Sequence, residues 1–169
     1  MKTEDLNKIK KMEVDEITEE IKRMHDELME DKKFFPESLL EKLDSEKALQ
    51  EIFEKILKDF KHHIYKEEKI LFPYLINLAK AARNEIPFEK PYFETVVNPI
   101  NMMQSDHESI NDATERLKIL IDDELSQKKI NSAIAEKIND IIEYIRKVIY
   151  LENVILFPKA ALLEKKFLV

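Results

Sequence analysis

The stretch HIYKEEKILFP at residues 63–73 returns in altered form as VIYLENVILFP at residues 148–158, 85 positions later. Seven of the eleven positions are identical, namely Ile, Tyr, Glu, Ile, Leu, Phe and Pro. The first position differs, because His63 is replaced by Val148 in the second copy. We interpret the two stretches as copies of one structural unit; chance convergence of two short Leu-Phe-Pro sequences is the alternative.

Apolar residues on both sides of the two stretches recur every three or four positions, which is the period of an α-helix. The pattern predicts four long helices. The first carries the apolar stripe from Val14 to Leu28, and the second runs from about residue 45 to the low 80s, where Pro73 bends or interrupts it. The third and fourth carry apolar stripes over residues 103–121 and 134–155.

Three segments rich in proline or polar residues separate these helices. FFPES at 34–38 interrupts the first stripe, NEIPFEKPYFETVVNP at 84–99 reads as the longest connection, and SQKKIN at 126–131 reads as a short turn. No segment alternates as a strand does. We therefore predict an all-α fold, an antiparallel up-down four-helix bundle built from a duplicated helical hairpin. It forms one domain over residues 1–169, with its core at about 14–163.

Composition excludes several classes of protein. Of the 169 residues, 44% are apolar and 37% are charged, and the chain has neither glycine nor cysteine. Disulfides, thiolate metal sites and glycine-rich phosphate loops are therefore excluded. The net charge of −7 argues against a nucleic-acid partner. The absence of a long apolar run argues against a membrane span and a signal peptide, so we expect a cytoplasmic protein.

Polar residues interrupt the apolar stripe of every predicted helix. Residues three or four positions apart lie on one face of a helix. Three histidines and two glutamates have this spacing from apolar residues of the stripes. We expect these five side chains to point into the bundle: His25, His63, Glu67, His107 and Glu152.

Burial of two carboxylates in an apolar core costs several kcal/mol unless a partner compensates their charge. A metal ion compensates it and uses neutral imidazoles as further donors, so we predict a metal site at these five residues. Core histidines that are simply hydrogen-bonded to glutamates are the alternative. His62 lies about 100° from the stripe, and we expect it at the surface or behind a ligand.

The motifs HIYKEEKILFP, SDHES and LENVILFPKA resemble those of hemerythrin-like, or HHE cation-binding, domains. The resemblance is closest to the di-iron domain of repair-of-iron-centres proteins, and it covers residues 17–163. It implies that His25 and His63 ligate one iron, that Glu67 and Glu152 bridge two irons, and that His107 ligates the second iron.

This chain departs from the family pattern on one side of the implied site. The family places histidines on the fourth helix where this chain has Val148 and Tyr150. The resemblance therefore implies that the second metal position is weakened. Residues to check as replacement ligands or hydrogen-bond donors are Glu41, Glu46, Glu115 and Tyr144, each of which has an ordinary surface or core role as its alternative.

Three functions follow from these patterns. The leading one is a non-haem metal protein that holds one or two ions and binds or senses O2, NO or peroxide, or handles iron. Histidine and carboxylate ligands also suit zinc and manganese, and iron is implied by the resemblance. No substrate is indicated, so we do not expect an enzyme. The alternative is a mono-metal or metal-free bundle that serves as an interaction module. Ferritin-like iron oxidation ranks lowest, because the chain lacks its Glu-x-x-His motifs.

Overall fold

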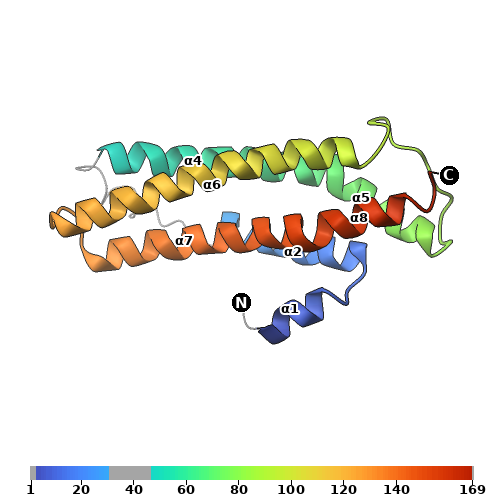
Figure 1. Ribbon diagram of the computed structural model, residues 1–169, viewed down its shortest axis with the longest axis horizontal. Coiled ribbons are helices and arrows are strands. Elements are labelled where there is room, and N and C mark those ends of the chain that lie inside the picture. The colour runs from blue at the N-terminus through green and yellow to red at the C-terminus, as the bar shows by residue number, and fades with distance from the viewer. Residues whose placement is uncertain (1–2, 31–46, 169) are drawn as a thin grey trace.

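The computed structural model describes residues 3–30 and 47–168, and every regular element in these residues is a helix (Figure 1). The prediction of an all-α chain is confirmed for this part of the sequence. The elements, in chain order, are α1 (Thr3–Ile9), α2 (Val14–Glu30), α4 (Lys47–Lys66), η1 (Glu67–Leu71), α5 (Phe72–Ala82), α6 (Val97–Ser126), α7 (Ser132–Leu151), η2 (Glu152–Leu156) and α8 (Phe157–Glu164).

The long helices lie side by side along the long axis of the molecule, and α1 projects away from them (Figure 1). Helix α4 packs against α6, α2 against α5 and α7, α6 against α7, and α5 against α8. The apolar stripes meet in one core that includes Ile21, Phe60, Ile110 and Ile145. None of the described helices is long and apolar enough to cross a bilayer.

Most predicted helix boundaries agree with the structure; one boundary differs, and one short helix is additional. Helix α6 begins at Val97, so Pro99 lies in its first turn, where a missing N–H is tolerated. Helix α1 was not predicted from the sequence. The predicted break at residues 34–38 lies outside the described residues.

Each repeated motif contains one turn of π-helix, η1 in the first copy and η2 in the second. The Phe72 N–H donates to the carbonyl of Glu67, and the Phe157 N–H donates to that of Glu152, so both bonds span five residues. Pro73 and Pro158 follow directly. A proline ring clashes with the carbonyl four residues earlier, and a wider turn relieves that clash. The interruption predicted at Pro73 therefore takes the form of a π-turn.

The π-turn changes which apolar residue of the first copy is buried. An α-helical period places Ile70 on the core face, but Ile70 is 41% exposed and Leu71 is fully buried. A π-turn has more residues than an α-turn, so it rotates the residues that follow Glu67 around the helix. Ile155, the counterpart of Ile70, is buried despite the same turn, so the packing of neighbouring elements also matters.

The chain ends two helices with left-handed residues although it has no glycine. Asn84 after α5 has φ 61° and Lys128 after α6 has φ 59°. The Glu85 N–H donates to the Lys80 carbonyl, and the Lys129 N–H donates to the Glu124 carbonyl, as in Schellman motifs. These tight ends fix where the connections to α6 and α7 begin.

Candidate metal centre

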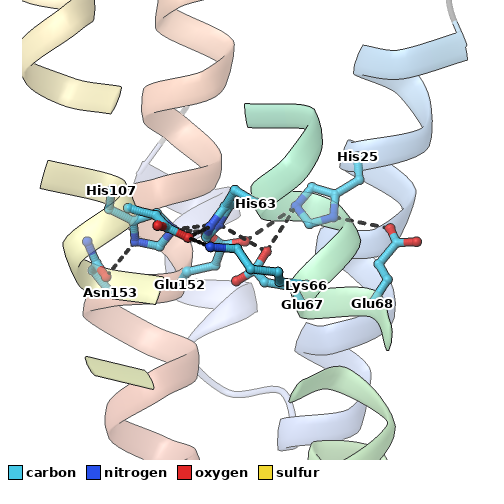
Figure 2. A network of polar contacts seen from close by, with 9 residues as sticks. His25, His63, Lys66, Glu67, Glu68, His107, Glu152 and Asn153 are labelled. Carbon is cyan, nitrogen blue, oxygen red and sulfur yellow. Dashed lines mark hydrogen bonds and ion pairs between the residues drawn. The ribbon is translucent and has the colours of Figure 1, made fainter. Parts of the chain in front are cut away.

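The five predicted residues come from five helical elements and meet in the core. His25 lies on α2, His63 on α4 and His107 on α6, while Glu67 and Glu152 are the first residues of η1 and η2. Each is at most 1% exposed. Figure 2 shows the three imidazoles and the two carboxylates turned toward one another.

The contacts among these five side chains form a closed ring. His63 Nε2 lies 2.8 Å from His107 Nε2, and His107 Nε2 lies 3.1 Å from Glu152 Oε2. Glu152 Oε1 lies 3.4 Å from His25 Nε2, which lies 3.7 Å from Glu67 Oε2. Glu67 Oε2 closes the ring at 3.3 Å from His63 Nε2. All three histidines therefore present Nε2 to one common centre.

A subset of four residues is compact enough to hold a metal ion. One ligand atom from each of His63, Glu67, His107 and Glu152 lies within 4.8 Å of all the others. His25 stands outside this tight group but contacts both carboxylates. The resemblance pairs His25 with His63, whereas the structure places the His63 nitrogen next to that of His107.

The carboxylates of the centre are buried without adequate hydrogen bonds. None of the four oxygens of Glu67 and Glu152, nor His25 Nε2, forms a hydrogen bond with any described residue. Imidazole nitrogens lie 3.1 to 3.7 Å from these oxygens. Buried carboxylates left in this state are strongly destabilising, and a cation between them removes the penalty. The donor set therefore fits a metal ion.

Each of the three histidines is held from behind by an oxygen acceptor. The Nδ1–H of His25 donates to Glu68 at 3.3 Å, that of His63 to Asp106 at 3.3 Å, and that of His107 to Asn153 at 2.9 Å. Glu68 and Asn153 lie on the outer sides of the centre (Figure 2). Histidines that bind metals through Nε2 usually donate the other N–H in this way, which fixes the tautomer and the ring orientation.

A lysine extends one of these outer contacts. Lys66 forms an ion pair with Asp106, the same carboxylate that accepts from His63. The hydrogen bonds from His63 and Lys66 lower the pKa of Asp106 to about 2, so this carboxylate stays charged. The three residues link α4 to α6 beside the centre.

The repeated Leu-Phe-Pro motif supplies an aromatic wall to the centre. The Phe72 ring stacks on His25 with centroids 5.8 Å apart, and the Phe157 ring stacks on His107 with centroids 5.9 Å apart. The π-turn separates each phenylalanine from the inward glutamate of its own motif. Each copy of the motif therefore provides one inward glutamate, one outer acceptor and one ring that packs on a histidine of a neighbouring helix.

The charges at the centre shift the protonation of its histidines. Burial lowers the pKa of His25, but the nearby carboxylates of Glu152, Glu68 and Glu67 outweigh burial and raise the pKa to about 9. Burial also lowers the pKa of His63, while the Glu67 charge and the bond to Asp106 raise it to about 10. Protons on these imidazoles therefore compensate the carboxylates until a metal ion displaces them.

The two glutamates titrate differently because their imidazole neighbours differ. Burial and the charge of Glu152 raise the pKa of Glu67. Burial raises the pKa of Glu152 as well, but the nearby imidazoles of His107 and His25 outweigh burial and lower the pKa to about 2. Glu152 is therefore the carboxylate that stays ionised beside the protonated imidazoles.

The structure places the other candidates named from the sequence away from the centre. Glu115 pairs with Arg146 at the surface, and the hydroxyl of Tyr144 donates to Glu27. Tyr150 and His62 are exposed, whereas Val148 is fully buried, as its position on the stripe requires. Glu41 and Glu46 lie outside the described residues.

The outer partners are functional residues that sequence reasoning missed. Glu68, Asp106 and Asn153 each sit next to an inward residue in the sequence, so their helical direction does not point into the core. A polar residue next to an inward residue in the sequence could have identified these partners. Its side chain lies about 100° around the helix from the inward one and can reach a neighbouring helix.

Comparisons with known proteins add no relative to this description. No protein-family model matches the chain, and neither the curated proteins nor the solved structures contain a significant match.

Proposed function

We propose that this chain is a hemerythrin-like non-haem metal protein that holds iron at the buried histidine and glutamate centre. The observation that carries the proposal is the state of Glu67 and Glu152, whose four oxygens are buried without hydrogen bonds to described residues and face three imidazoles. A metal ion is the partner that this donor set lacks.

The outer contacts support metal binding over a merely hydrogen-bonded core. A structural histidine cluster needs no acceptor behind each ring, yet all three Nδ1–H groups have one. This pattern leaves every Nε2 lone pair available to a metal. A metal-free interaction module would also gain stability if the two buried glutamates were apolar.

The proposal includes the fold type. The long helices lie side by side, and a short turn at residues 127–131 connects α6 to α7, as in an antiparallel up-down four-helix bundle. The repeated motif places equivalent residues on α4–η1 and on α7–η2, which suits a duplicated hairpin of the hemerythrin type.

The role we propose for the centre is binding or sensing of a small molecule, or iron handling. A bound ferrous ion would leave coordination positions open to O2, NO or peroxide. The chain's own contribution is to present the donors, orient the rings through their outer acceptors, and exclude bulk water with the stacked rings of Phe72 and Phe157.

Reconstitution with ferrous iron under anaerobic conditions tests this proposal. We expect purified protein to retain iron after desalting and to change its visible absorption when nitric oxide is added. His63→Ala should lose the iron, whereas His62→Ala, which removes the exposed neighbouring imidazole, should retain it. Circular dichroism checks that both variants fold.

Two results would contradict the proposal. If the wild-type protein retained neither iron, zinc nor manganese, the metal-free interaction module would be the function that remains. Equal retention of iron by His63→Ala and wild type would show that the metal sits elsewhere. Iron without any response to nitric oxide would instead support iron handling over small-molecule binding.

A further inference from the structure

The two repeats of the chain place equivalent residues at constant offsets. A residue on α2 corresponds to the residue on α6 that is 82 positions later, as His25 corresponds to His107. A residue on α4 or η1 corresponds to the residue on α7 or η2 that is 85 positions later. Two kinds of contact follow this correspondence. The His25–Glu68 bond recurs as His107–Asn153, and the two phenylalanine–histidine stacks recur as well.

One set of polar contacts does not recur. Where α4 faces α6, the charged network consists of His63, Lys66 and Asp106. The same offsets map these residues to Val148, Leu151 and Met24, where α7 faces α2. These three are apolar and at most 2% exposed. We call the two places the polar seam and the apolar seam.

The apolar seam differs by more than one missing ligand. A lone His-to-Val replacement at position 148 would leave an acceptor and its lysine partner in place, as Asp106 and Lys66 stand beside His63. Met24 stands where that acceptor would be, and Leu151 stands where its lysine partner would be. Ligand, acceptor and counter-charge have therefore been replaced together, and the seam packs as ordinary core.

The remaining donors converge as they would on a single ion. Two nitrogens bound at right angles to one ion, each at about 2.1 Å, lie about 3.0 Å apart, and the His63 and His107 nitrogens are 2.8 Å apart. In a two-metal site the ions stand about 3.5–4 Å apart. The two inward carboxylates also balance the charge of one divalent ion.

From this asymmetry, and resting on the metal binding proposed above, we infer that the protein has a single-ion centre. His63, Glu67, His107 and Glu152 hold the ion, His25 flanks it, and the apolar seam of Met24, Val148 and Leu151 closes the position of a second ion. Val148→His by itself does not restore that position, because the new imidazole would have no acceptor behind it.

Metal content per folded chain tests this inference, measured after loading with ferrous iron alone and with Zn²⁺ alone. We expect one ion in the wild type and one in Val148→His. The double variant Met24→Asp with Val148→His rebuilds the ligand and its acceptor, and should bind two. Two ions in the wild type, or in Val148→His alone, would overturn the inference, as would a folded double variant that still binds one.

A mirror variant avoids the risk of a buried new carboxylate. His63→Val with Lys66→Leu and Asp106→Met copies the apolar seam into the polar seam, so its residues are ones that this fold already packs. A single-ion centre should then lose its metal, with retention reduced at least 100-fold. One ion retained at wild-type affinity would show that a second, independent position exists. Absence of metal from the wild type would refute the proposed function itself.

Discussion

The polar seam between α4 and α6 and the apolar seam between α2 and α7 occupy equivalent places in the two repeats and differ in chemistry. The polar seam carries His63, backed by Asp106 and Lys66. The apolar seam carries Met24 and Val148. The two repeats thus keep similar packing, but only the polar seam keeps a histidine with its acceptor and lysine.

The shared features are as informative as the different ones. Both repeats keep the inward glutamate, the π-turn and the stacked phenylalanine. An apolar core would be more stable without two buried carboxylates, so their presence in both repeats fits a site that needs both charges. A histidine at position 148 is the donor that the proposed single ion does not need.

The largest expected effect tests the part that the two repeats share. Glu67→Gln and Glu152→Gln should each weaken metal binding by more than about 100-fold, because removal of a ligand exceeds the loss of an outer partner. Competition with a chromophoric chelator measures both affinities. Loss in one variant and wild-type affinity in the other would contradict equal roles for the two glutamates.

A second difference between the repeats concerns stability. Glu164 on α8 is buried and accepts hydrogen bonds from Tyr74 (2.6 Å), Thr95 (2.6 Å) and the Val96 N–H (2.8 Å), whereas its counterpart on α5 is Ala79. Glu164→Ala should lower the free energy of unfolding by about 2 kcal/mol, because buried donors lose their acceptor.

Urea denaturation measures the stability of this variant, and metal analysis serves as its control. Metal content should stay at the wild-type value, because Glu164 does not contact the centre. A loss of metal without a loss of stability would show that the α5–α8 end of the molecule has a different role from the one described.

The outer acceptors offer a smaller effect. Asp106→Ala and Asn153→Ala remove the partners of His63 and His107, and each should weaken metal binding about 10-fold, the lower end of the effect of outer partners. Metal content at saturation should not change. Unchanged affinity in both variants would show that the rings are held by the phenylalanine stacks alone.

The smallest effect comes from a surface difference at the ends of the repeats. Arg83 after α5 pairs with Asp15 of α2 at 2.7 Å, and its counterpart by the 85-residue offset is Leu168. Arg83→Ala should lower the free energy of unfolding only slightly, because exposed ion pairs contribute little.

The pH dependence of that effect has a definite sign. The hydrogen bond from Arg83 lowers the pKa of Asp15 below its ordinary value of 3.8. The stabilisation is therefore complete above that ordinary value and disappears as the pH falls through the lowered pKa. Denaturation of wild type and Arg83→Ala at neutral and acidic pH should show curves that converge in acid.

Much of the fold could be predicted, because the apolar period extends over whole helices. The stripe from Val14 to Leu28 gave α2, and the interruption expected at Pro73 is present. Its form as a π-turn, and the exposure of Ile70 that accompanies it, depend on neighbouring elements that a single helical period does not describe. Helix α1 is short and carries too few apolar residues to stand out.

The sequence predicts which residues point into the centre, but not which of them contact one another. Extension of each stripe brought His25 and Glu152 to the inside, since the inward face of a helix is a local property. The contacts between histidine nitrogens depend on the axial register between helices. The apolar period of a single helix does not determine that register. The approach of His63 to His107 and the support from Asp106 therefore emerged only in three dimensions.

The central claim is one ion held between His63 and His107, and anomalous scattering at the iron edge tests it most directly. Crystals of the anaerobically reconstituted wild-type protein should show a single anomalous peak at bonding distance, about 2.1 Å, from both Nε2 atoms. Two peaks about 3.5–4 Å apart, the spacing of a two-metal site, would contradict the single-ion account. No peak within the ring of five side chains would contradict the metal centre.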